Sequence, residues 1–171
     1  MQLRLKLAAI ASATALAVSL GLALAGPAAA VDEQALCVTP TTHNGVLCAF
    51  NFDGLGQTVS AVGPPGGYWD MPGVRGQITS DLAGSGGNVH LCMELDASDH
   101  DYIVMAYCQG KASEEWTAEA GHNSGTTVYV NGYKTNLCLN VYPFGEYPQL
   151  IGYTCSKTSL NQEFYPHLSP N

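Results

Sequence analysis

The sequence predicts an all-β fold made of repeated units and held together by disulfide bonds. A motif of Leu-Cys, a second cysteine and a closing aromatic residue occurs over residues 91–116 and again over residues 137–164. Matching positions of the two copies lie about 46 to 48 residues apart, a period typical of repeat architectures. The chain also has 19 glycines and 9 prolines, and no segment after residue 30 keeps the apolar spacing of an amphipathic helix.

Residues 1–30 have the pattern of a secretory signal peptide. Arg4 and Lys6 precede a long apolar run, and small residues then lead to an Ala-x-Ala site that ends at Ala30. We therefore expect cleavage after Ala30 and a secreted, single-domain protein of residues 31–171. A membrane anchor is the alternative, because the run is nearly long enough to cross a bilayer, but no charge cluster follows it to stop transfer.

The charge of the chain excludes several classes of partner. Its formal net charge is −8, and the predicted mature part is more acidic because it lacks Arg4 and Lys6. Nucleic acids and anionic membranes need a basic surface, so we expect neither nucleic-acid binding nor membrane insertion after signal cleavage. We expect no cofactor and no metal site, since there is no Cys-x-x-Cys pair and the 5 histidines are scattered.

A degenerate copy of the motif precedes the other two. It begins with Leu47-Cys48, closes at Trp69 and lacks the second cysteine. The three copies then cover about residues 46–80, 90–125 and 136–168. Residues 74–80 are expected to form one strand. Residues 126–130 are β-branched and aromatic, and the Asn-Gly pair that follows them is a strong hairpin signal.

The 6 cysteines all follow residue 30, and an even number in an exported chain indicates disulfide bonds. Six cysteines allow 15 pairings, but the second and third copies each hold two cysteines at equivalent places. The two remaining cysteines pair by elimination. The expected bridges are Cys92–Cys108, Cys138–Cys155 and Cys37–Cys48.

The repeat resembles that of the ricin B-type lectins. The closing motif, Gln-x-Trp in the family, appears here as Gln162-Glu163-Phe164, Glu114-Glu115-Trp116 and, more faintly, Gly67-Tyr68-Trp69. The resemblance covers about residues 46–168 and implies a β-trefoil, three four-stranded copies around a pseudo-threefold axis. Buried aromatic rings remove a large apolar area from water, so we expect the closing aromatics Trp69, Trp116 and Phe164 in the core.

A sugar site needs carboxylate or amide groups for the hydroxyls and an aromatic plane for the less polar face of the ring. The family has one such shallow pocket in each copy. The resemblance places the third-copy pocket at Asn140, Tyr153 and Asn161, with Gln162 as support and Ile151 beside it. Asn140 stands where the family has Asp, and a neutral amide bonds hydroxyls more weakly than a carboxylate. An ordinary polar turn is the alternative interpretation of Asn161 and Gln162.

The other two copies lack parts of this pocket. The second keeps an acid, Glu94, but has Ala106 at the aromatic position and Ser113 in place of the Asn. Its Tyr107 is one residue out of place and should point to the other face of the strand. The first copy has Phe50 at the acid position. We therefore expect one competent site, in the third copy, or none.

The sequence lacks Gly-x-Ser-x-Gly, His-Glu-x-x-His and phosphate-loop motifs. An acidic cluster offers carboxylates that suit calcium or a glycosidase, but it lacks calcium-loop spacing, so we interpret it as a solvated loop. The cluster is Glu94, Asp96, Asp99, His100 and Asp101. The aromatic-rich segment around Tyr147 is a candidate extension of the third-copy pocket.

The sequence thus predicts a secreted, disulfide-bonded β-trefoil that binds carbohydrate and has no catalytic activity. A trefoil that binds or inhibits another protein, with vestigial sugar pockets, is the main alternative. A small hydrolase that uses the acidic cluster is a second. No oligomeric state is predicted.

Overall fold

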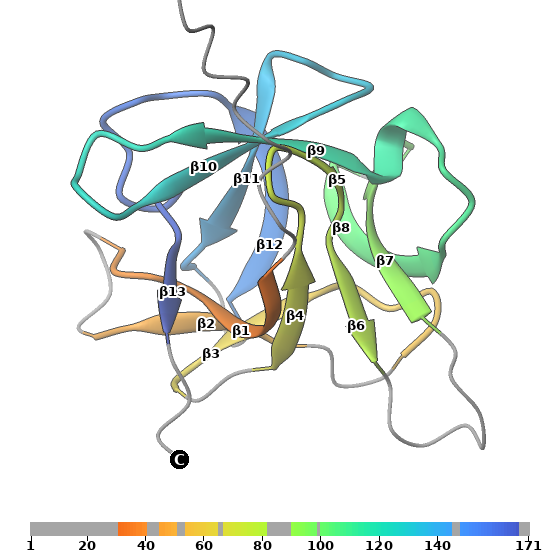
Figure 1. Ribbon diagram of the computed structural model, residues 1–171, viewed down its shortest axis with the longest axis horizontal. Coiled ribbons are helices and arrows are strands. Elements are labelled where there is room, and N and C mark those ends of the chain that lie inside the picture. The colour runs from red at the N-terminus through yellow and green to blue at the C-terminus, as the bar shows by residue number, and fades with distance from the viewer. Residues whose placement is uncertain are drawn as a thin grey trace, which may run out of the picture.

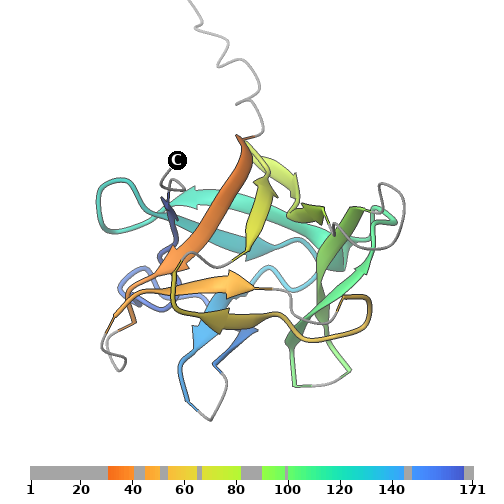
Figure 2. The same ribbon diagram turned by 90° about the horizontal axis from the view of Figure 1, so that it is seen from below.

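The computed structural model describes residues 31–40, 45–50, 54–64, 67–81, 90–98, 100–144 and 148–167. Within these ranges the chain is strand and loop, apart from one short 3-10 helix, η1 (Ala112–Glu114), which confirms the all-β prediction. Two views at right angles show the strands arranged around a shared interior (Figures 1 and 2). The predicted signal peptide lies outside the described residues. No helix among those described is long and apolar enough to cross a membrane.

The described strands form one 13-stranded sheet, and every pairing in it is antiparallel. In chain order they are β1 (Val31–Val38), β2 (Leu47–Phe50), β3 (Ser60–Val62), β4 (Tyr68–Met71), β5 (Arg75–Gln77), β6 (Thr79–Asp81), β7 (His90–Asp96), β8 (Tyr102–Tyr107), β9 (Glu115–Ala120), β10 (Thr127–Asn131), β11 (Leu137–Tyr142), β12 (Gln149–Thr154) and β13 (Tyr165–His167). The sheet runs β3-β2-β1-β4-β6-β7-β8-β12-β11-β10-β9-β5, with β13 beside β1. A further pairing of β3 with β12 closes part of this path into a ring, which leaves those strands without a free edge.

The three segments predicted as copies contact one another in a cycle. One antiparallel bridge joins the first copy to the second, another joins the second to the third, and a third returns to the first. Each bridge lies at a corresponding place in the repeat. The bridges are Thr58–Val104, Tyr102–Ile151 and Gln149–Ser60. The chain therefore uses the same inter-copy contact three times around the interior.

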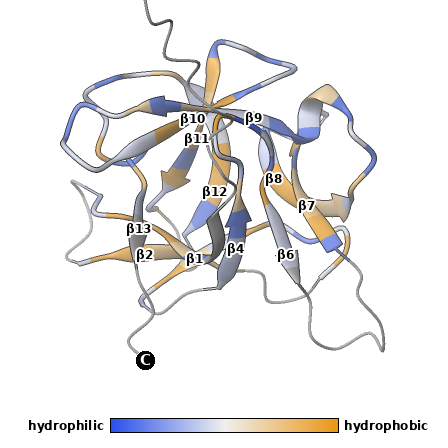
Figure 3. Cartoon of the chain, viewed as in Figure 1, coloured by the Kyte–Doolittle hydropathy of each residue, from blue (hydrophilic) through white to orange (hydrophobic). Residues whose placement is uncertain are grey.

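The closing aromatic residues lie in the core, as predicted. Trp69, Trp116 and Phe164 are 1%, 0% and 1% exposed and belong to one apolar cluster, to which the largely apolar strands β7 and β8 contribute (Figure 3). The Trp69 indole N–H donates to the Ala49 carbonyl at 3.1 Å, and the Trp116 indole N–H donates to the Met93 carbonyl at 3.0 Å. Both acceptors directly follow the first cysteine of their copy, so the first and second copies make the same internal contact.

All three predicted disulfides are present. They are Cys37–Cys48, Cys92–Cys108 and Cys138–Cys155. In the second and third copies the bridge joins the first strand of the motif to the residue that follows the second strand, so each bridge closes its own hairpin. Loops of this size should each add about 3 kcal/mol to stability by restricting the unfolded chain.

One strand prediction is confirmed and another is wrong. β10 forms as expected, and the turn after Asn131 leads into β11, its antiparallel partner. The single strand predicted over residues 74–80 is instead two strands, β5 and β6, separated by the buried Ile78. β5 pairs with β9, whereas β6 pairs with β4 and β7. The chain changes partners at Ile78, and the strand breaks there.

Candidate functional site

Four of the five predicted third-copy residues lie together on or beside the outward face of the β11–β12 hairpin. Asn140 and Ile151 are direct cross-strand partners, and Tyr153 lies two places further along β12. Because side chains alternate across a strand, these three share one face. The Val141 N–H donates to the Asn161 carbonyl at 2.9 Å, which brings Asn161 beside β11.

These four residues differ in what they present to a ligand. Tyr153 is 59% exposed, so its ring is available for contact. Asn140 is only 5% exposed, so its amide is recessed. The Asn161 Oδ1 is a buried oxygen for which the described residues offer no hydrogen-bond donor. Buried acceptors are normally bonded, and a ligand hydroxyl would supply the missing donor.

Gln162, the fifth predicted residue, is fully buried. Its Oε1 accepts a hydrogen bond from the Ser156 N–H at 2.8 Å, and its Nε2 donates to the Thr154 carbonyl at 3.0 Å. These two bonds hold the turn that follows β12. Gln162 therefore holds this turn from the interior, and its burial prevents direct contact with a ligand.

Glu163 is also buried, and it holds the loop between β9 and β10. The His122 N–H donates to its Oε1 at 2.7 Å, and Asn123 donates to its Oε2 from both backbone and side chain. Burial raises the pKa of Glu163, but the hydrogen bonds from Asn123, His122 and Thr126 outweigh burial, so the pKa lies below its ordinary value of 4.5. The ionised carboxylate is the form that holds this loop.

We expect Glu163→Gln to destabilise the protein at pH 7 and much less at pH 3. Because folding lowers this pKa, the carboxylate contributes its full stability above the ordinary value of 4.5, and the contribution is lost as pH falls through the folded pKa. A hydrogen bond to a charged group typically contributes about 2 kcal/mol, so we expect the substitution to lower the free energy of unfolding by about that amount at pH 7. Urea unfolding of both proteins at the two pH values measures this, and an equal loss at both would contradict it.

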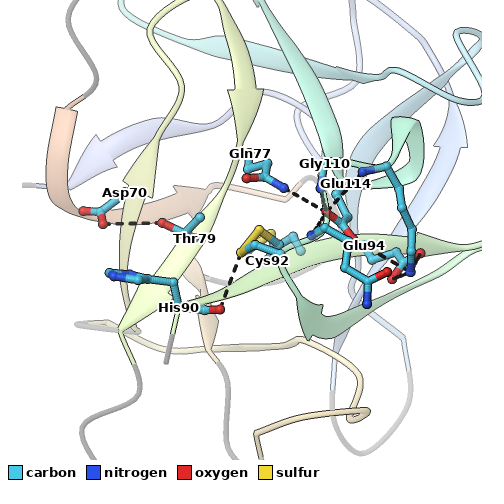
Figure 4. Close-up of a disulfide and its surroundings, with 12 residues drawn as sticks. Asp70, Gln77, Thr79, His90, Cys92, Glu94, Gly110 and Glu114 are labelled. Carbon is cyan, nitrogen blue, oxygen red and sulfur yellow. Dashed lines mark hydrogen bonds and ion pairs between the residues drawn. A yellow bond between two sulfur atoms is a disulfide. The ribbon is translucent and has the colours of Figure 1, made fainter. Parts of the chain in front are cut away.

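A cavity of about 460 Å³ lies at the corresponding place in the second copy. Its lining includes Glu94, Val104, Lys111, Ser113 and Tyr133. Glu94 and Val104 are cross-strand partners, as the central pair is in the third copy. The Ser113 hydroxyl donates to Glu94 Oε1 at 2.9 Å, and Lys111 Nζ lies 3.3 Å from the same oxygen. Figure 4 shows Glu94, which lies on β7, together with the nearby Glu114 and Gly110.

Tyr133 lines this cavity with an aromatic ring from outside the second copy, whose own aromatic residues are not part of the lining. It is 62% exposed and lies in the turn between β10 and β11. The buried Asn131 holds this turn: its Oδ1 accepts from the Tyr133 N–H at 3.0 Å, and its Nδ2 donates to the Ser113 carbonyl at 3.1 Å. A Cβ on Gly132 would lie 2.9 Å from the Ala112 carbonyl oxygen, so glycine lets the turn approach this closely.

Glu114 has in the second copy the place that Gln162 has in the third. It is fully buried, and its Oε2 accepts from the N–H groups of Gln109 at 2.7 Å and Gly110 at 2.8 Å. The Gln77 side chain donates to the same oxygen at 2.8 Å, from the neighbouring β5 (Figure 4). In both copies the buried side chain holds the residue that follows the second cysteine. In the second copy this turn leads into the wall of the cavity.

The sequence predicts no competent pocket in the second copy, because Ala106 stands at its aromatic position, but in the folded chain Tyr133 lines the cavity there. Comparison of the copies could not find Tyr133, because it precedes the third-copy motif and reaches the second copy only in the folded chain. Asp99 and Tyr147, named in the acidic cluster and the aromatic segment, lie outside the described residues. Among the residues that are described, no three His, Cys, Asp or Glu side chains are grouped so as to hold a metal ion.

Comparison with known proteins relates this chain to others by fold. No protein-family model matches its sequence, and no curated protein matches it either. One similar solved structure is the designed threefold-symmetric protein ThreeFoil, with a TM-score of 0.60 and 14% identity. That match covers 77% of this chain and 96% of ThreeFoil.

Two natural proteins also contain a similar structure. One is the GlcNAcα1-4Gal-releasing endo-β-galactosidase from Clostridium perfringens, with a TM-score of 0.56, 14% identity and 80% of this chain covered. The other is the Polyporus squamosus lectin bound to the epitope Neu5Acα2-6Galβ1-4GlcNAc, with a TM-score of 0.54, 12% identity and 80% covered. The chain spans 33% of the galactosidase and 49% of the lectin. At these identities the likeness shows a shared all-β fold.

Proposed function

We propose that this protein is a secreted β-trefoil of three ricin B-type repeats that binds carbohydrate and catalyses no reaction. The fold likeness to a designed threefold-symmetric protein and to a lectin supports the proposal, and so do the three corresponding inter-copy bridges. Three disulfides suit an oxidising compartment, which agrees with the signal-like residues 1–30.

The cavity of the second copy carries this proposal. Its volume of about 460 Å³ lies within the range of about 300 to 1,000 Å³ that small-molecule sites occupy. The Glu94 carboxylate and the Ser113 oxygen, whose hydrogen already bonds Glu94, accept hydrogen bonds from sugar hydroxyls, while Lys111 donates them. The Tyr133 ring and the Val104 side chain provide apolar surface for the C–H face of a sugar. In Glu94 the cavity has the charged acceptor that the third-copy pocket lacks.

The third-copy pocket is the second proposed site. Tyr153 supplies the ring, the unsatisfied Asn161 Oδ1 and the recessed Asn140 supply the polar contacts, and Ile151 lies beside them. A neutral amide bonds hydroxyls more weakly than a carboxylate, so this site should be the weaker of the two. Two sites in one chain favour ligands that present several sugar units, because the second contact is then intramolecular.

A glycan array with the oxidised protein of residues 31–171 tests the proposal. The double variant Glu94→Gln with Tyr133→Ala removes the negative charge and the aromatic ring of the second-copy cavity. A second double variant, Asn161→Ala with Tyr153→Ala, removes two contacts of the proposed third-copy site. Loss of a charge-assisted bond and a ring contact should lower affinity by about tenfold or more at the altered site. Tyr107→Ala, an exposed tyrosine outside both sets, is the control and should bind like the wild type.

Two outcomes would contradict the proposal. Retained binding in a protein that carries all four substitutions would place the glycan elsewhere on the surface. If the folded, oxidised wild-type protein bound no glycan on the array, the result would favour the alternative of a protein-binding module with vestigial pockets. The near-complete burial of Asn140 favours that alternative in the third copy, because so recessed an amide offers a ligand little surface.

A further inference from the structure

The outward face of the β11–β12 hairpin continues past the third-copy pocket as a surface rich in aromatic rings. Tyr142 lies two places beyond Asn140 on β11, so both point outward. Tyr142 is 46% exposed and Phe144, just after the strand, is 56% exposed. Their ring centroids are 5.2 Å apart in an edge-on arrangement. Two exposed rings that support each other in this way provide a firm apolar platform at one end of the face.

Tyr153 stands at the other end of the same face. It pairs with the position four residues before Tyr142 on β11, and four residues of strand span about 13 Å. The pocket pair, Asn140 and Ile151, lies between these two rings. We define the neutral track as the outward side chains of Tyr153, Ile151, Asn140 and Tyr142, together with Phe144. Its length exceeds what a single sugar ring covers.

The track carries no charge, although the chain as a whole has a formal net charge of −8. The remaining outward positions of the hairpin are Cys138, which is in a disulfide, and Gln149, which is neutral. Neither a cationic nor an anionic ligand gains an ion pair from these side chains. Rings at both ends and one recessed amide, Asn140, in between suit a neutral ligand that alternates C–H surface with hydroxyl groups. Successive units of a neutral polysaccharide have that chemistry.

We propose that the neutral track binds several consecutive units of a linear, uncharged polysaccharide, so that the third-copy pocket holds an internal unit of the chain. This proposal rests on the proposed carbohydrate-binding function. It adds Tyr142 and Phe144 as binding residues and names the ligand class as polysaccharide chains. A pocket alone would bind one terminal sugar with an affinity that does not depend on chain length.

Calorimetric titration with xylo-, manno- and gluco-oligosaccharides of two and six β-linked units tests the track. In the series that binds, we expect affinity to rise by about tenfold from two to six units, since each ring contact contributes a factor of several. Tyr142→Ala with Phe144→Ala should abolish that gain and leave the affinity for two units within about twofold of wild type. Tyr107→Ala is the matched control and should keep the gain. Tyr107, Tyr142 and Phe144 are all exposed, so the melting temperatures of both variants should stay close to that of the wild type.

The outcomes separate this proposal from the function on which it rests. Equal affinity for two and six units, or array binding confined to terminal sugars, overturns the track and leaves carbohydrate binding intact. An equal loss for short and long ligands in the double variant also overturns it. Failure to bind any glycan overturns both. If size-exclusion chromatography shows a dimer that the double variant converts to a monomer, the face binds a second copy of the chain, and the track is overturned.

Discussion

Trp116→Ala is expected to lower the free energy of unfolding by about 4 kcal/mol, the usual cost of deleting a large buried aromatic ring. Trp116 is 0% exposed and lies in the apolar cluster that the three copies share. The substitution also leaves the Met93 carbonyl without its donor. Domains of this size are stable by only about 5 to 15 kcal/mol, so the variant should unfold at a markedly lower urea concentration.

Trp116→Phe is the matched control, because the third copy already carries phenylalanine, Phe164, at this place. The ring is kept and the indole hydrogen bond is lost, so the expected loss is about 1 to 2 kcal/mol. Urea unfolding followed by tyrosine and tryptophan fluorescence measures both variants. If Trp116→Ala lowered the free energy of unfolding no more than Trp116→Phe did, the aromatic ring would contribute nothing to the stability of the core. The common role assigned to the three closing aromatics would then be wrong.

Glu114→Ala is expected to cost about 3 kcal/mol and to abolish binding in the second-copy cavity. The substitution deprives the backbone N–H groups of Gln109 and Gly110, and the Gln77 side chain, of their acceptor. Each buried donor left without a partner costs about 1 to 3 kcal/mol. The same turn continues into Lys111 and Ser113, so its release should disperse two of the groups that surround Glu94.

Glu114→Gln separates the loss of the acceptor from the loss of the charge. Gln162 holds the corresponding turn of the third copy with one amide, so the glutamine variant should stay within about 1 kcal/mol of wild type and keep the cavity. Unfolding in urea and titration with an array-selected glycan, for wild type and both variants, provide the comparison. Cavity binding by Glu114→Ala at wild-type strength would show that the turn keeps its shape without this carboxylate.

The repeat made much of the fold predictable. Cysteines at equivalent places in two copies must occupy equivalent places in space, which is why Cys92–Cys108 and Cys138–Cys155 were assigned correctly and Cys37–Cys48 followed. The closing aromatics were assigned to the core on the same ground. The break at Ile78 was not predictable, because residues 74–80 are suited to a strand throughout, and only the identity of the distant partner strands makes the chain change neighbours there.

The two candidate sites also differ in how far the sequence could predict them. Asn140, Ile151 and Tyr153 lie within one hairpin, where the alternation of side chains and the pairing of adjacent strands bring them to one face, so the sequence alone determined their grouping. Tyr133 comes from another part of the chain to line the same cavity as Glu94, and the buried Asn131 links its turn to the Ser113 carbonyl. Contacts between copies depend on how the closed sheet brings together turns that are far apart in the sequence. A local sequence pattern carries no information about which distant turns become neighbours. The sequence thus determined the repeats, the disulfides and the third-copy face, while only the tertiary structure decided where an aromatic ring and a carboxylate share a cavity.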